Sequence, residues 1–206
     1  MILFNRKKKM NILGLDISTA IIGYCIISIN DNKEFAFEKY DYIDVNKLVN
    51  SEDENDVFKV FDKIYQVMPI LERIIKEYKI EKVYIESPNK LFKTGLSSIE
   101  IITKLLVFNY VISDNIRRHI KLPIEHINAR SARSIVFGKS FNSPSLKEFG
   151  NAKTLVFNNL MIDYPQLEVL KTKLNRNNNL HSWVYDICDS IVIALFGAKK
   201  IIKNSK

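Results

Sequence analysis

Two apolar, strand-like segments follow one another near the start of the chain with only a short turn between them. The first, NILGLDIS, begins at Asn11, and the second, IIGYCIISI, ends at Ile29. Neighbouring β-rich runs separated by a short turn predict a β-hairpin. A weakly alternating segment over residues 34–42 comes next, so we expect the chain to begin with three consecutive strands.

The rest of the chain alternates between helical and strand-like patterns. Residues 57–78 carry apolar side chains three and four apart, which predicts a helix, and Pro69 inside it predicts a kink or break. Short apolar runs predict strands over residues 82–86 and 124–127. Further helices are expected over residues 98–114, 129–137, 152–161 and 183–200, and the polar, Asn-rich segment 171–180 is interpreted as a mobile loop. This order predicts an α/β fold, a mixed sheet with helices on both faces.

No linker divides the 206 residues, so we expect one domain over residues 10–202, preceded by a basic arm (residues 1–9) and followed by a tail (residues 203–206). Hydrophobic residues make up 47% of the chain, which excludes global disorder. No apolar run reaches the roughly 20 residues that cross a bilayer, and the basic N-terminus lacks the features of a signal peptide. We therefore expect no membrane partner and no secretion.

The two cysteines, Cys25 and Cys188, lie in apolar segments and are expected to be buried, reduced thiols. This cysteine usage fits a cytoplasmic protein and argues against a disulfide framework or a structural zinc site. Lys and Arg number 31 against 23 Asp and Glu, which gives a formal charge of +8. The excess suits a nucleic-acid partner, although charge that only serves solubility is the simpler alternative.

Four acidic residues stand out because of the segments in which they lie. Asp16 interrupts the first apolar strand, and Glu86 ends the fourth expected strand. Asp186 and Asp189 lie three residues apart, on one face of the last helix. Each has an ordinary alternative: a turn after Asp16, a surface strand end at Glu86, and helix-dipole stabilisation for the last pair. Together they indicate a cation site, and oxygen ligands of this kind suit Mg²⁺ or Mn²⁺.

Several segments carry a family resemblance. ILGLDISTAIIGYCII resembles the first hairpin of the RuvC-type Holliday-junction resolvases in the RNase H-like superfamily, and VYIES resembles their strand that ends in the second catalytic acid. NARSARSIVFGK, GNAKTLVFNNL and DICDSIVIAL are similar to the later helical segments of that family. The resemblance follows the same order over residues 11–198. It implies an RNase H-like fold, with a mixed five-stranded sheet flanked by helices on both faces.

The resemblance also implies a metal-dependent nuclease that needs no protein nucleophile or small-molecule cofactor. Asp16, Glu86, Asp186 and Asp189 would hold two Mg²⁺ ions, which Mn²⁺ could replace, and Lys153 would lie near the scissile phosphate. Lys153 as a solvated helix lysine is the alternative. Cleavage would leave 5′-phosphate and 3′-hydroxyl ends. The chain departs from the family in extra residues at its N-terminus, around 46–56 and at 165–180.

Branched DNA, chiefly four-way junctions, is the expected partner. Phe92 is a candidate for an aromatic that inserts into the junction, but it lies farther from Glu86 than in the family, and anchoring of its loop is the alternative. The apolar residues of helix 98–114 lie on more faces than one sheet can cover, which predicts a homodimer unless other helices cover them. The candidate phosphate contacts are Lys90, Lys93, Arg130, Arg133, Lys139 and Lys147.

Three other function classes compete. Another RNase H-like nuclease would cut RNA–DNA hybrids, flaps or other branches, but in an RNase H the second acid is a helix residue, whereas Glu86 ends a strand. A sugar-kinase or actin-like ATPase shares a similar first strand, but it needs Gly-rich phosphate loops, and the six glycines here are not clustered. A catalytically inactive DNA-binding relative is disfavoured by the presence of all four acids.

Overall fold

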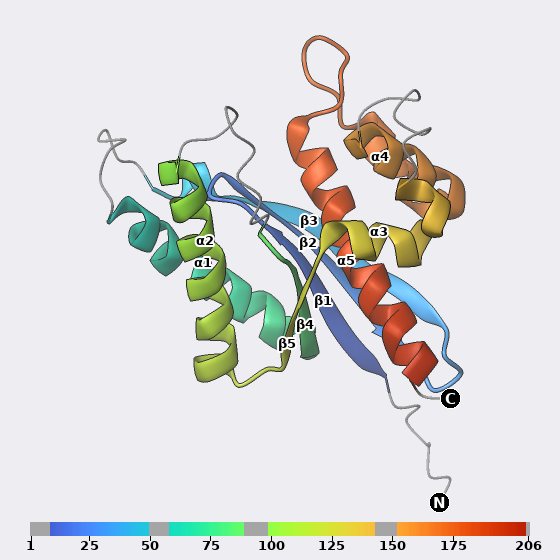
Figure 1. Cartoon of the computed structure of the whole chain (residues 1–206), viewed down its shortest axis with the longest axis horizontal. Helices are drawn as coiled ribbons and strands as arrows, with labels where there is room; N and C mark the ends of the chain where they lie inside the picture. The colour runs from blue at the N-terminus through green and yellow to red at the C-terminus, as the bar shows by residue number, and fades with distance from the viewer. Residues whose placement is uncertain (1–8, 50–57, 89–98, 143–151, 205–206) are drawn as a thin grey trace, which may run out of the picture.

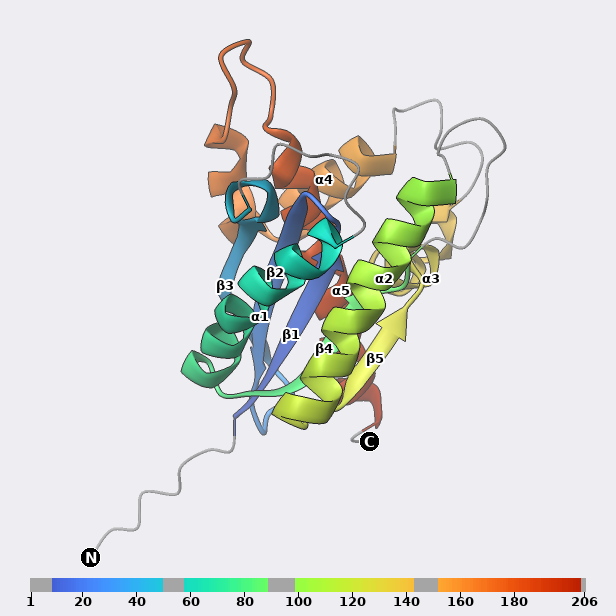
Figure 2. The same ribbon diagram turned by 90° about the vertical axis from the view of Figure 1, so that its left-hand side faces the viewer.

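The computed structural model describes residues 9–49, 58–88, 99–142 and 152–204 (Figures 1 and 2). One five-stranded sheet has the strand order β3-β2-β1-β4-β5. β1 pairs antiparallel with β2, as β2 does with β3, whereas the β1–β4 and β4–β5 pairs are parallel. The predicted mixed sheet is confirmed. The strands are β1 (Met10–Ile17), β2 (Ile21–Ile29), β3 (Phe35–Asp44), β4 (Ile80–Glu86) and β5 (Ile124–Ile127).

Helices cover both faces of the sheet, as predicted (Figure 2). α1 (Lys59–Glu77) and α2 (Ile99–Asn115) pack on one face, in a core that includes Leu13 and Leu15. The other face carries α3 (Ala129–Phe137), α4 (Ala152–Asp163) and α5 (Ser182–Asn204), in a core that includes Ile12. Because side chains alternate along a strand, Asp16 belongs to the same face as Ile12, the α5 face.

Most predicted elements agree with the structure to within a few residues. Of the kink or break predicted at Pro69, the break is wrong, because α1 continues through this residue. Buried side chains on both sides of it, Val67, Met68 and Leu71, hold the helix against the sheet, and this packing outweighs the lost backbone hydrogen bond. α5 extends to Asn204 and includes part of the expected tail. A π-helical turn over Ile116–Ile120 after α2 had no sequence signal.

Two glycines let α5 lie directly on the sheet. A Cβ atom at Gly14 would come within 2.6 Å of the Ser190 carbonyl oxygen, and one at Gly23 within 2.1 Å of the Asp186 carbonyl oxygen. Any side chain at either position would force the helix away from the strands. The first turns of α5 are therefore fixed above the end of the β1–β2 hairpin.

None of the described helices combines the length and apolar composition needed to cross a membrane.

Candidate active site

Asp16 and Glu86 lie next to each other at the carboxyl ends of two neighbouring parallel strands. Leu15 of β1 pairs with Ile85 of β4, so the residue that follows each of them is at the same level in the sheet. Tyr84, two residues before Glu86, lies under α5, where a Cβ atom on Gly197 would collide with its ring. Both acids consequently point to the α5 face.

α5 brings the other two acids to this place. Asp186 lies in its first turns directly over Gly23, and Gly23 is the antiparallel partner of Asp16 in the sheet. Asp189 follows three residues later on the same face of the helix and is buried. The four acids that the sequence singles out thus come together from β1, β4 and α5.

Burial and the charges of neighbouring carboxylates raise the pKa values of Asp16, Glu86 and Asp186. Burial, followed by the charges of Glu86, Asp189 and Asp186, raises the pKa of Asp16 well above its ordinary value. Burial and then Asp189 raise the pKa of Glu86 to about 7. Burial also raises the pKa of Asp186, against the opposing effect of Lys153. Like charges held this close in a partly buried site call for a compensating cation.

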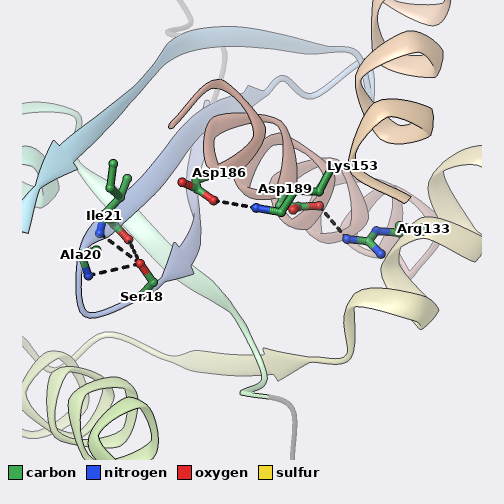
Figure 3. Close-up of polar contacts among 7 residues, drawn as sticks. All are labelled: Ser18, Ala20, Ile21, Arg133, Lys153, Asp186 and Asp189. Atoms are coloured by element: carbon green, nitrogen blue, oxygen red, sulfur yellow. Dashed lines mark hydrogen bonds and ion pairs between the residues drawn. The ribbon is translucent and has the colours of Figure 1, made fainter. Parts of the chain in front are cut away.

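Two basic side chains supply part of that compensation (Figure 3). Arg133 of α3 donates from Nη2 to Oδ1 of Asp189 over 2.8 Å, and Lys153 of α4 donates from Nζ to Oδ1 of Asp186 over 3.2 Å. Burial lowers the pKa of Lys153, but the Asp186 carboxylate outweighs this and the net pKa is raised. Both cations engage the α5 acids, so the charges of Asp16 and Glu86 have no ion-pair partner among the described residues.

The donor chemistry of this cluster fits hard divalent cations. All four groups are carboxylates, the ligands that Mg²⁺ and Mn²⁺ take most readily, and the charges of the other three act on Asp16. As the side chains stand, no three His, Cys, Asp or Glu residues among those described are grouped closely enough to hold one ion. Figure 3 shows that the carboxylate of Asp186 is instead turned toward Lys153, and that of Asp189 toward Arg133.

The turn after β1 is closed by Ser18 and not by Asp16 (Figure 3). The Ser18 hydroxyl donates to the Ile21 carbonyl over 2.7 Å and accepts from the backbone N–H groups of Ala20 and Ile21. A turn-forming role for the Asp16 carboxylate, the alternative explanation from sequence, is therefore not what the structure shows. The turn instead leaves that carboxylate available to the cluster.

Asn109 is a site residue that the sequence analysis missed. It lies in α2, is only 1% exposed, and donates from Nδ2 to the backbone carbonyl of Glu86 over 3.3 Å. Its own Oδ1 atom is buried and has no hydrogen-bond partner among the described residues. A polar residue in an otherwise apolar stretch of helix was the available signal. Asn109 positions the end of β4, and with it Glu86.

The predicted DNA contacts fall into two groups. Arg130 and Lys139 line an open hollow of about 430 Å³ beside α3, together with Ser131 and Ser134. Arg133 is turned inward, with its side chain 18% exposed and on Asp189, so it belongs to the acidic cluster more than to the outer surface. Lys90, Phe92, Lys93 and Lys147 lie outside the described residues.

No family model matches the sequence, and comparison with curated proteins finds no match either. Solved structures do resemble the chain. Thermus thermophilus RuvC in complex with a Holliday junction substrate matches with a TM-score of 0.56 at 10% identity, covering 91% of this chain and 92% of RuvC. The yeast mitochondrial Holliday junction resolvase Ydc2 matches with a TM-score of 0.61 at 13% identity, covering 94% and 80%.

A third similar structure is the Fowlpox virus resolvase in complex with Holliday junction DNA. Its TM-score is 0.53 at 15% identity, and the match covers 93% of this chain and 99% of the viral protein. At such low identity the likeness concerns the path of the backbone. Together with the strand order and the helices on both faces of the sheet, it shows that this chain has the RNase H-like fold of the RuvC-type Holliday junction resolvases.

Proposed function

We propose that the chain is a metal-dependent endonuclease that resolves branched DNA, chiefly four-way junctions, by paired nicks. The observation that carries this proposal is the meeting of Asp16, Glu86, Asp186 and Asp189 at one end of the sheet, in a fold shared with junction resolvases. Basic groups border this cluster on α3 and α4. The arrangement supports phosphodiester hydrolysis that leaves 5′-phosphate and 3′-hydroxyl ends.

The four carboxylates would hold two Mg²⁺ ions, which Mn²⁺ could replace, and such ions supply an activated water and stabilise the leaving oxygen. The chain's own residues do the positioning. Arg130 and Lys139 bind backbone phosphates at the hollow on α3, and Lys153 offers its ammonium group to the phosphate that is cut. Arg133 balances the negative charge of Asp189.

Labelled substrates test this proposal directly. In Mg²⁺, a four-way junction should be cut symmetrically, and the products should be sealed by a DNA ligase because their ends are 5′-phosphate and 3′-hydroxyl. Three-way, flap, linear and RNA–DNA hybrid substrates complete the panel. Preferred cleavage of the hybrid would assign the chain to a different RNase H-like activity. Tight junction binding without cleavage in either Mg²⁺ or Mn²⁺ would indicate an inactive DNA-binding relative.

Binding selectivity is a separate prediction. We expect four-way or three-way DNA to bind at least about tenfold more tightly than linear duplex, a difference of about 1.4 kcal/mol. Basic side chains meet phosphates in both kinds of DNA, so the preference has to come from the shape of the branch. Both affinities should fall steeply with salt because phosphate contacts release counterions. Gel-shift titrations without divalent metal, at several salt concentrations, measure both quantities. Equal affinity for linear and branched DNA at moderate salt would contradict the resolvase assignment.

We also propose that two copies of the chain form a dimer through α2. Only four residues of this helix, Phe108, Asn109, Ile112 and Ser113, are buried in the single chain. Ile99, Ile101 and Tyr110 are 74%, 60% and 43% exposed. The other described helices leave these three side chains exposed, which favours a dimer over the alternative that other helices cover α2. A symmetric partner would cover them and give two active sites for paired nicks.

Dimerisation predicts a specific response to added charge. In the Ile99→Glu/Tyr110→Glu variant, carboxylates placed on α2 should repel across the interface and convert the protein to monomers, as measured by sedimentation velocity at micromolar concentration. Tyr65→Glu/Ile162→Glu is the matched control, because both of its positions are strongly exposed on other helices, at 72% and 75%. The control should remain dimeric. A wild-type chain that sediments as a monomer with and without junction DNA would contradict the prediction.

A further inference from the structure

Residues 173–181 form a hairpin that projects beyond the body of the domain, at the end where the acidic cluster lies (Figure 1). The backbone N–H of His181 donates to the Lys173 carbonyl over 3.0 Å. Leu174 and Leu180 form an antiparallel bridge next to that bond. The sequence analysis expected a mobile loop here, whereas the structure shows a defined element between a 3₁₀ helix (Pro165–Thr172) and α5.

The Asn-rich sequence accounts for the tight turn at the tip. The Asn175 Oδ1 atom accepts from the backbone N–H groups of Asn177 and Asn179, over 2.9 and 3.2 Å. The Asn175 N–H donates to the Asn179 carbonyl over 2.7 Å. Asn178 has a φ of 58°, in the left-handed region that Asn tolerates better than most residues. The side chains that make this segment polar therefore also shape it.

A stack of three rings anchors the base of the hairpin. The ring of His181 stacks on Trp183 with a centroid distance of 5.3 Å, and Trp183 stacks on Tyr42 of the edge strand β3 at 4.5 Å. The interplanar angles of 17° and 14° are close to parallel. The stack ties the hairpin to the sheet and to the start of α5, which fixes the direction in which it projects.

The hairpin carries positive charge that is only partly neutralised by ion pairs with described residues. Residues 171–181 contain Lys171, Lys173 and Arg176 and no acidic residue. Lys171 pairs with Glu168, but Lys173 and Arg176 are exposed and form no ion pair with a described residue. Neither of them lines the open hollow of about 460 Å³ beneath the hairpin, which Leu174 and Leu180 share with Phe157 and Tyr185.

The base of the hairpin lies close to the candidate active site. His181 immediately precedes α5, and Asp186 follows Ser182, the first residue of that helix, by four positions, about 6 Å along its axis. Lys153, on the neighbouring α4, reaches the same Asp186 carboxylate. A DNA duplex with one phosphate at the acidic cluster extends beyond the cluster on both sides. The hairpin is an anchored basic element next to the cluster, where it can contact the phosphates of such a duplex.

We propose that the hairpin 173–181 is a DNA-binding element, in which Lys173 and Arg176 bind backbone phosphates of the duplex arm next to the cleavage site. This inference rests on the proposed nuclease function and adds a substrate contact to it. The contacts give affinity and set the position of one arm relative to Asp186. The three-ring stack makes His181 and Trp183 positioning residues, because they hold the hairpin without touching DNA themselves.

Charge removal tests the proposal against a matched control. The Lys173→Ala/Arg176→Ala variant should bind a four-way junction about tenfold more weakly, and the slope of log affinity against log salt should become shallower by about 1.8. Lys76→Ala/Lys203→Ala removes the same amount of charge from exposed positions near the carboxyl ends of α1 and α5. This control should keep the wild-type slope. Equal slopes for the wild-type chain and the hairpin variant would overturn the proposal.

A tethered probe locates the contact without relying on activity. Cys25 and Cys188 are buried, so the Asn177→Cys variant offers one exposed thiol among the described residues for a DNA-cutting iron chelate. We expect cuts on one arm, within a few nucleotides of the position nicked by the wild-type enzyme in Mg²⁺. Cuts spread evenly over all arms, or none on a bound junction, would overturn the proposal. If the wild-type chain binds and cuts junctions, such a result leaves the proposed function intact; if it binds no DNA at all, both fail together.

Discussion

The Asp16→Asn variant should lose at least about 10³-fold in the rate of junction cleavage and still bind the junction as tightly as the wild-type chain. Asn keeps the size of the side chain but removes the charge at the centre of the cluster, where three other carboxylates act on Asp16. Binding should survive because the proposed phosphate contacts come from Arg and Lys residues on other elements. Single-turnover cleavage in Mg²⁺ and gel-shift titrations in EDTA measure the two quantities.

The matched control for this variant is Asp163→Asn. It makes the same chemical change at the exposed end of α4 and should leave the cleavage rate unchanged. Glu86→Gln and Asp189→Asn should behave as Asp16→Asn does. Wild-type cleavage by a folded Asp16→Asn protein would remove the central claim about the site, whatever the substrate. Loss of both cleavage and binding would instead place Asp16 in the DNA interface.

The acidic cluster could be predicted from the sequence because its signals are local. A carboxylate inside an apolar strand is conspicuous whatever the fold, and the strand β4 ends at Glu86 as expected.

Short elements bounded by strong turn or cap signals were also predicted to the residue, as in β5 and α3. Asn128 caps α3 by accepting from two backbone N–H groups, and Gly138 ends it.

Other features of the site depend on packing that no local pattern reveals. In the sequence, Arg133 is one of several basic residues on a short helix. In the structure, α3 packs so that the Arg133 guanidinium contacts Asp189, which lies 56 residues later in the chain. Gly14 and Gly23 look like ordinary strand residues until α5 is laid across them. Asn109 acquires its role from the Glu86 carbonyl, which belongs to a different element. Each of these requires the tertiary arrangement first.

Two expectations rested on local rules that leave out packing and side-chain bonding. A proline inside a helix tends to kink or break it, but packing of the buried face of α1 keeps this helix continuous through Pro69. An Asn-rich, basic segment is typical of a mobile loop, but Asn175 closes the turn itself. The ring of Tyr42, far away in sequence, completes the stack that anchors it. A search for Asx-type bonding within such segments could have found the first of these two contributions.

The second large effect concerns stability in the absence of divalent metal. The pKa of Glu86 rises from its ordinary value of 4.5 to about 7 in the folded chain, mainly through burial and then through Asp189. The folded state therefore binds a proton more tightly than the unfolded state does. This stabilisation is fully present below the unfolded pKa and is lost as the pH rises toward 7. Metal-free wild-type protein should thus be more stable near pH 5 than near pH 8.

The Glu86→Gln variant should remove the contribution of Glu86 to this dependence. Without the Glu86 charge, the folded chain no longer holds that carboxylate ionised at high pH, and one of the charges that raise the pKa of Asp16 also disappears. At about pH 8 in EDTA we expect the variant to be more stable than the wild-type chain by about 2 kcal/mol. Urea unfolding at both pH values, followed by circular dichroism, measures the difference.

Added Mg²⁺ should reverse the order of stability at high pH. An ion that binds only the folded state stabilises it by an amount that grows with the logarithm of its affinity, and the variant lacks one of the four ligands. Glu81→Gln, an exposed change at the other end of the same strand, should follow the wild-type chain in both EDTA and Mg²⁺. A wild-type chain that is more stable at about pH 8 than at about pH 5 in EDTA would contradict the repulsion between these acids. A gain of stability in EDTA without any response to Mg²⁺ in the wild-type chain would keep the repulsion but argue against a metal site, which separates the electrostatics of the cluster from its proposed use.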